Sequence, residues 1–198
     1  WNPATGEVIT QAKHDTEDDF IDAVSRVRDA QLEWAERPVR ERARIVARLS
    51  RAVRQRRDEL AALVSQCSGK TRSDAMTGDV APIGLAAAWY ARAGRRLMRR
   101  RRLRRGHPFF ALIKKSYLVR EPLGVIGIIS PWNYPFGIPM HEVMMALVTG
   151  NGVVLKVATQ AQPVGEAIIE LLHAVGIPTD LVALVHLPGR QAGDAFLG

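Results

Sequence analysis

Two polar residues that could take part in chemistry follow short apolar segments in the second half of the sequence. Asn133 lies between Pro131 and Pro135, directly after an apolar run. The prolines restrict the backbone, so the Asn133 amide could be held ready to donate to an oxygen that becomes negative during a reaction. Lys156 ends the next apolar run, where its ammonium could reach a ribose or a phosphate. From the residues alone, an ordinary turn asparagine and a lysine with only structural contacts are equally good interpretations.

Other motifs fit their chemistry less well. Residues 69–71 read Gly-Lys-Thr, like the end of a phosphate-binding loop, but Val64 stands where that loop needs a glycine. Met145 stands where a zinc-binding helix that begins at His141 would need its second histidine, so we predict no metal site. Cys67 is the only cysteine, and it follows an apolar helical pattern just before a glycine. A helix C-terminus opposes thiolate formation, so we interpret Cys67 as a structural residue.

Apolar residues at spacings of three and four predict helices in the first half of the sequence. Three are expected, the first starting at a capping-box-like Thr16 and the last running from about Ser73 to Arg102. Residues 107–121 then combine short apolar runs with charge, which is typical of an exposed strand or pair of strands. We therefore divide the chain into a helical segment, a strand arm and an α/β unit, at residues 1–106, 107–121 and 122–198.

From residue 124 onward the pattern predicts strands that alternate with helices. The three expected strands cover residues 125–129, 152–157 and 181–187. They are continuously apolar, which indicates burial on both faces and therefore a parallel βαβαβ sheet, half of a doubly wound fold. Ligands of such sheets bind beyond the C-terminal ends of the strands, which is where Asn133 and Lys156 stand.

The composition excludes some classes and leaves one charged feature open. The 198 residues are 47% hydrophobic, and no stretch approaches the roughly 20 apolar residues that span a membrane. The single cysteine suits a reducing compartment. The net charge of +8 comes from the Arg95–Arg105 run, whose eight arginines are the excess of 28 basic over 20 acidic residues. We interpret this run as the solvated end of a helix, with binding to nucleic acid or anionic lipid as the alternative. No aromatic residues alternate with the arginines, so no nucleic-acid partner is expected.

These segments, in this order, resemble the aldehyde dehydrogenase superfamily along almost the whole sequence. The resemblance is carried by "EPLGVIGIISPWNYPFGIP" and "ALVTGNGVVLK", with "WNPATGEVI" near the start and "HAVGIPTDLVALVHLPG" near the end. It implies N-terminal helices, an oligomerisation strand arm at 107–121, and the first βαβαβ half of a Rossmann-like NAD(P)-binding domain. It also implies a dimer or tetramer and a cytoplasmic location.

The resemblance implies NAD(P)-dependent oxidation of an aldehyde through a cysteine thioester, with Asn133 as a donor to the oxyanion. The residues that it places at the cofactor are Ile129, Ser130, Pro131, Trp132, Asn133, Lys156 and Thr159. Many members have a glutamate at the position of Thr159, which holds the ribose hydroxyls. Because threonine lacks that carboxylate, NADP is at least as plausible as NAD.

The nucleophilic cysteine and the general-base glutamate of the family have no matching position in this sequence. The resemblance therefore implies an N-terminal portion that is inactive alone. Release of the acyl group to coenzyme A remains an enzymatic alternative. A non-catalytic module that binds anionic partners through the Arg95–Arg105 run is an alternative of a different class. Met140, Met144 and Met145 would border the aldehyde tunnel, although core packing is the simpler interpretation of these methionines.

Overall fold

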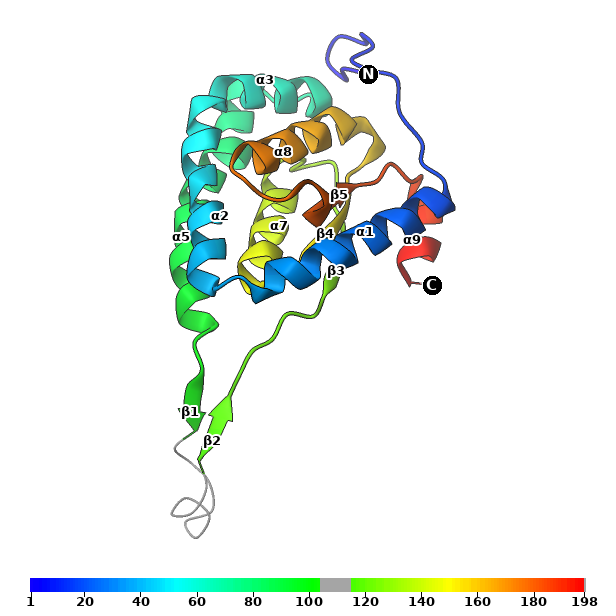
Figure 1. Cartoon of the computed structure of the whole chain (residues 1–198). Helices are drawn as coiled ribbons and strands as arrows, with labels where there is room; N and C mark the ends of the chain where they lie inside the picture. Colours follow the sequence, from blue (N-terminus) through cyan, green and yellow to red (C-terminus); the bar gives the residue numbers. More distant parts are fainter. Residues whose placement is uncertain (104–114, 198) are drawn as a thin grey trace.

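The computed structural model of the chain describes residues 1–103 and 115–197 (Figure 1). The helical segment contains α1 (Glu17–Glu36), α2 (Val39–Gln55), α3 (Arg57–Ser68), α4 (Arg72–Asp74), the π-helical turn η1 (Ala75–Val80) and α5 (Ala81–Leu97). The arm contains β1 (Arg101–Leu103) and β2 (Ser116–Leu118). The α/β unit contains β3 (Val125–Ile129), α7 (Gly137–Thr149), β4 (Gly152–Lys156), η2 (Thr159–Ala161), α8 (Gln162–Ala174), η3 (Thr179–Leu181), β5 (Val182–Leu184) and α9 (Gly189–Leu197). This order of helices, arm and βαβαβ unit confirms the predicted fold class.

The three strands of the α/β unit form a parallel sheet in the order β3-β4-β5, with helices on both faces. Within β4, Val153 and Leu155 join the large core that contains α7 and α8. Val154 faces the other way and packs with residues of α1 and α9. Gly152 also lies on the α1 side, where a side chain would collide with Val27. Burial on both faces explains why the apolar pattern of this strand is continuous.

Local signals and long-range contacts together fix the helical segment. Thr16 and Asp19 form the expected capping box at the start of α1, because each side chain accepts a hydrogen bond from the backbone of the other. Near the other end of α1, Trp34 Nε1 donates to the carbonyl of Leu147 over 2.9 Å. This bond ties α1 to the last turn of α7, so the helical segment and the α/β unit share one core.

Some boundaries of the second and third predicted helices were wrong. The second predicted helix is split at Arg56 into α2 and α3, and the third begins with the separate pieces α4 and η1. That third helix ends at Leu97 and not at Arg102. Arginine favours helices, but residues 101–103 pair antiparallel with residues 116–118 instead. Arg120 Nη1 then donates to the Leu97 carbonyl over 2.7 Å and satisfies the end of α5.

The predicted positions of the arm and of the third strand of the sheet also differ from the structure. The arm was predicted at 107–121, but its first described strand lies earlier, at Arg101–Leu103, and residues 104–114 lie outside the described residues. The third strand of the sheet ends at Leu184 and not at Leu187. Beyond it the chain turns to the N-terminal segment, where the His186 backbone N–H donates to the Asp15 carboxylate. Among residues 1–103 and 115–197, no helix combines the length and apolarity that crossing a membrane requires.

Candidate functional site at the ends of two parallel strands

The two turns singled out in the sequence lie at the same edge of the sheet. Ile129 is the register partner of Lys156, and the Ser130 N–H donates to the Lys156 carbonyl over 2.8 Å. The structure therefore brings Ile129, Ser130 and Lys156 together at the C-terminal ends of β3 and β4. This edge is where ligands of doubly wound sheets bind.

The turn after β3 presents its side chains to solvent. Pro131, Trp132, Asn133 and Tyr134 are all exposed, with 56% of the Trp132 surface accessible. Asn133 makes no hydrogen bond to any side chain or backbone group in the described part of the chain. Its amide is thus available to donate to a group bound in front of the sheet edge.

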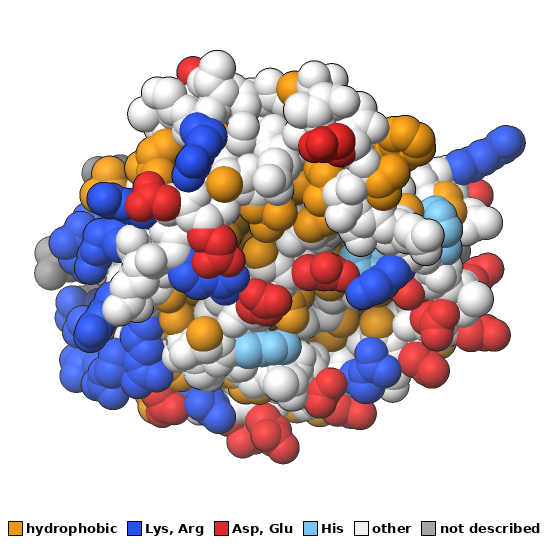
Figure 2. Space-filling model, turned by 90° about the horizontal axis from the view of Figure 1, so that it is seen from above, with side chains coloured by type: hydrophobic (Ala, Val, Ile, Leu, Met, Phe, Trp, Pro, Cys, Tyr) orange, Lys and Arg blue, Asp and Glu red, His pale blue; other side chains and the backbone are white. Residues whose placement is uncertain are grey.

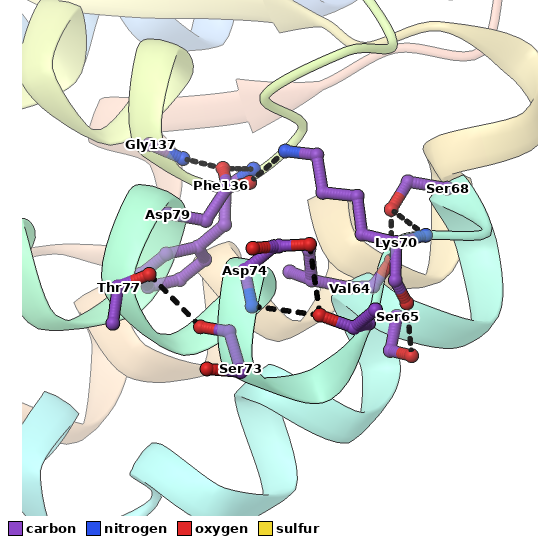
Figure 3. A network of polar contacts seen from close by, with 11 residues as sticks. Val64, Ser65, Ser68, Lys70, Ser73, Asp74, Thr77, Asp79, Phe136 and Gly137 are labelled. Carbon is purple, nitrogen blue, oxygen red and sulfur yellow. Dashed lines mark hydrogen bonds and ion pairs between the residues drawn. The ribbon is translucent and has the colours of Figure 1, made fainter.

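A buried carboxylate from the helical segment holds the far side of this turn, as Figure 3 shows. Asp79, on the π-helical turn η1, is completely inaccessible to solvent. Its Oδ1 accepts from the backbone N–H groups of Gly137 and Phe136, over 2.8 and 3.3 Å. Its Oδ2 accepts from Lys70 Nζ over 2.6 Å. Sequence reasoning missed Asp79 altogether and considered Lys70 only as part of a rejected phosphate loop.

The turn after β4 is built around a buried lysine. Lys156 is only 7% exposed and forms no ion pair within residues 1–103 and 115–197. Burial lowers the pKa of its ammonium, because the charged form loses contact with water. Thr159 is exposed at the start of η2. It lines a pocket of about 300 Å³ with residues of the N-terminal segment, including Trp1 and Ile9.

The donor set at the sheet edge fits an anionic or hydroxylated ligand. Ser130 is 3% exposed, and its Oγ has no hydrogen-bond partner among the described residues. Buried polar groups are nearly always paired, so the unpaired Ser130 hydroxyl marks a place for a polar ligand. The sugar and phosphate oxygens of a dinucleotide would satisfy both Ser130 and Lys156.

The remaining candidates from the sequence are structural. Cys67 is buried at the end of α3, and burial raises the pKa of its thiol to about 11. A thiol of that kind is a poor nucleophile at neutral pH. Met140 and Met144 are fully buried in the core, whereas Met145 is partly exposed beside β3. In the described ranges no three metal-ligating side chains are grouped. His141 contacts Tyr90 Oη through Nδ1 at 3.2 Å.

The arginine run extends from the end of α5 through a short connection into β1. A groove of about 800 Å³ is lined by Pro38, Val39, Arg40, Arg92, Arg95, Arg96, Met98 and Arg99. Arg100 instead stacks over the Tyr117 ring at 3.5 Å, and Arg101 and Arg102 belong to β1. Figure 2 shows Lys and Arg side chains gathered along one side of the molecule. Arg104 and Arg105 lie outside the described residues.

Comparison with known proteins decides which family the strand-end site belongs to. The sequence matches the family described as "Aldehyde dehydrogenase family" over residues 1–198. The chain belongs to the aldehyde dehydrogenase family. A relative from Mycolicibacterium smegmatis, provisionally named succinate-semialdehyde dehydrogenase (NADP(+)), is 36% identical over 193 residues, which are 98% of this chain and 37% of that protein.

Two further proteins are similar to this chain. The 4,4'-diapolycopene aldehyde oxidase of Methylomonas sp is 33% identical over 171 residues, which are 86% of this chain and 32% of that protein. The crystal structure of a NAD-dependent benzaldehyde dehydrogenase from Corynebacterium glutamicum superposes with a TM-score of 0.88 at 29% identity, over 99% of this chain and 42% of that one. The chain thus spans about a third of the length of the curated relatives.

Proposed function

We propose that the whole protein oxidises an aldehyde to a carboxylic acid with NAD or NADP, through a cysteine thioester. The observation that carries this proposal is the shared strand edge, where the turn with the exposed Asn133 amide is joined to the end of β4 by the backbone hydrogen bond from Ser130 to Lys156. The names of the family relatives, which include aldehyde dehydrogenases that use either cofactor, support it.

Each residue has a defined role in this proposal. Asn133 donates its amide N–H to the oxygen of the substrate carbonyl, which becomes negative when a thiolate adds to the carbon. Ser130 and Lys156 bind the cofactor, and Ile129, Pro131 and Trp132 line its site. When bound, NAD(P) supplies the acceptor for the hydride that leaves the substrate. The protein's own part is to bind, to orient and to stabilise developing charge.

The nucleophile is proposed to come from outside the 198 residues. Cys67 is the only cysteine in the sequence, and it is buried in the core far along the chain from the strand-end turns. We therefore expect the chain by itself to form no NAD(P)H from an aldehyde. Measurable aldehyde-dependent NAD(P)H formation by these 198 residues alone would contradict this part of the proposal.

The experiment that tests the function is turnover of the whole protein with Asn133→Ala. Loss of one oxyanion donor lowers kcat by about 10² to 10³-fold. We expect that loss of kcat with little change in the KM for the cofactor. Both are obtained from the absorbance of the NAD(P)H that forms. Asn2→Ala, which changes an asparagine in the first turn of the chain, is the matched control. Unchanged turnover in Asn133→Ala would exclude the proposed role.

The choice of cofactor is proposed to depend on Thr159. A threonine neither clamps the ribose hydroxyls through a carboxylate nor repels a 2′-phosphate, so the whole protein should accept NADP at least as well as NAD. Thr159→Glu should lower kcat/KM for NADP relative to NAD, and Gln160→Glu is the neighbouring control. An unchanged ratio in Thr159→Glu would show that this residue does not contact the ribose.

The arginine groove supports a second candidate function, the binding of anionic partners. The arginines that line it come from α2, from α5 and, for Arg99, from the residues that follow α5, and they have no acidic partner within 4.0 Å among the described residues. Binding of a short anionic heparin fragment that weakens with salt and is lost in Arg95→Gln with Arg96→Gln would support it. Arg28→Gln, on α1, is the control, and binding that survives the double change would exclude the groove.

We further propose that the arm joins subunits into a dimer or tetramer. Strands β1 and β2 are almost fully exposed in the single chain, and in the part of the chain that the structure describes each strand pairs only with the other. A neighbouring subunit could pair with their outer edges. We retain the division at residues 1–106, 107–121 and 122–198 as a proposal, with the correction that the first strand of the arm lies ahead of residue 107, at Arg101–Leu103. We also propose a cytoplasmic location, because the chain has a single, buried cysteine.

A further inference from the structure

We propose that Asp79 and Lys70 are positioning residues, which fix the turn that carries Asn133 in its productive orientation. This inference rests on the proposed role of Asn133 as an oxyanion donor. The pair belongs to the helical segment, and it reaches the catalytic turn across more than fifty residues of sequence. Its contacts explain how an exposed amide can be held still.

The first step is that Asp79 caps helix α7 from another element. The N-cap residue of α7 is Phe136, whose side chain forms no capping hydrogen bond. The Asp79 carboxylate replaces that cap by accepting from the Phe136 and Gly137 N–H groups. A negative charge at a helix N-terminus is also favoured by the helix dipole. Asn133 lies three residues before this cap, so the cap sets where the turn ends.

The second step is that Lys70 links the carboxylate to the exposed part of the turn. Its ammonium donates to Asp79 Oδ2 and also lies 3.9 Å from the centre of the Tyr134 ring. Tyr134 directly follows Asn133, so one cation holds both the cap and the residue next to the donor. Lys70 is itself fixed, because its carbonyl accepts from Ser65 Oγ over 2.7 Å.

The third step is that the local backbone is shaped to let Asp79 approach. A Cβ at Gly137 would lie 3.2 Å from Asp79 Oδ1, so a larger residue would push the carboxylate away. Asp79 stands on the π-helical turn η1, and such turns are frequent at functional sites because they redirect side chains. The short helix before η1 is held by Thr71 Oγ1, which accepts from the Asp74 N–H over 3.1 Å.

The fourth step is that the opposite end of α7 is held in the same way. Gln31 Nε2 donates to the Gly150 carbonyl over 2.9 Å, and Trp34 Nε1 donates to the Leu147 carbonyl. Helix α7 is therefore clamped at its C-terminus by α1 and at its N-terminus by Asp79. With both ends fixed, the turn before α7 cannot slide along the helix axis, and the Asn133 amide keeps its place at the sheet edge.

The experiment is a double-mutant cycle between Asp79 and Asn133 in the whole protein. Asp79→Asn should lower kcat by about 10- to 100-fold, the loss expected for a displaced catalytic group, and leave the cofactor KM nearly unchanged. In the Asn133→Ala background the same change should lower kcat by less than about twofold, because its effect passes through Asn133. Asp22→Asn, at an exposed position of α1, is the control and should leave kcat unchanged.

A second pair of variants keeps the test decisive if Asp79→Asn does not fold. Gly137→Ala leaves both charges in place and only displaces the carboxylate, so it should show the same dependence on Asn133. Lys70→Arg should retain more activity than Lys70→Met. The positioning role would be overturned if the kcat losses of these variants simply added to the loss of Asn133→Ala, or if the variants left kcat unchanged. If Asn133→Ala alone left turnover unchanged, the proposed function would fall and this inference with it.

Discussion

The turns after β3 and β4 lie side by side at one sheet edge, yet different forces hold them. The turn after β3 projects exposed side chains and is held by a charged pair from the helical segment, Lys70 and Asp79. The turn after β4 follows a strand that is buried throughout, and Leu155 and Val157 fix it inside the main core. One turn therefore depends on a few polar contacts and the other on packing.

This difference teaches that the donor and the proposed cofactor contacts can be perturbed separately. Polar contacts are directional, so the loss of one partner reorients the turn after β3 without emptying the core. Packing is collective, so a change beneath the turn after β4 acts on the whole domain. The predictions below use that separation, beginning with the largest expected effect.

The largest effect is expected from a cavity beneath the turn after β4. Leu155→Ala removes a side chain that is completely buried, and such changes lower the free energy of unfolding by about 3 kcal/mol. Urea denaturation of the chain measures the loss. Leu123→Ala, at an 88% exposed position before β3, should change the stability little. Similar losses in both variants would mean that β4 is not the packed centre of this unit.

A smaller loss is expected when the charged pair of the other turn is broken. Lys70→Met leaves the Asp79 carboxylate buried beside uncharged groups. Because Lys70 is itself partly exposed, we expect a loss of about 2 kcal/mol, below the range for fully buried pairs. Lys13→Met breaks an exposed pair with Glu166 and should leave the urea midpoint nearly unchanged. Equal midpoints for wild type and Lys70→Met would show that the pair does not stabilise the turn.

The smallest effect has the opposite sign. Burial lowers the pKa of Lys156, so the folded chain carries a poorly solvated charge at neutral pH, and this destabilisation is relieved only as the pH rises through the lowered pKa. Lys156→Met should therefore raise the free energy of unfolding at pH 7 by about 1 kcal/mol. The gain should shrink as the pH rises toward 10.5, the ordinary pKa of a lysine. In the whole protein, Lys156→Met should also weaken the binding of the cofactor. A loss of stability at pH 7 would show that Lys156 has a stabilising partner.

Much of this fold could be predicted from local patterns. The continuous apolar runs predicted the parallel βαβαβ unit, because a strand that is buried on both faces has apolar residues at successive positions. The capping box at Thr16 predicted the start of α1. The end of α5 could not be predicted in this way, because arginine propensity favours a helix and only the pairing of residues 101–103 with 116–118 ends it.

The candidate site could be predicted only in part. The turns after β3 and β4 follow from strand ends, which a sequence shows. The role of the Lys70–Asp79 pair follows from the contact of Asp79 with the start of α7, which no local pattern records. An aspartate without a recognisable motif in a helical segment gives no sign that it caps a helix 57 residues later. Prediction failed where function depends on a long-range polar contact.

The central claim is that polar contacts hold the turn after β3 and packing holds the turn after β4. Hydrogen exchange at single backbone amides of the chain tests this claim most directly. In Asp79→Ala the Gly137 amide loses its acceptor, so its exchange should accelerate by about 10- to 100-fold, the loss expected for a bond to a charged group. The Ser130 amide, which donates to the Lys156 carbonyl, should keep the wild-type rate. Asp22→Ala, at an exposed position of α1, should change neither rate. Equal acceleration of both amides, or of neither, would contradict the account.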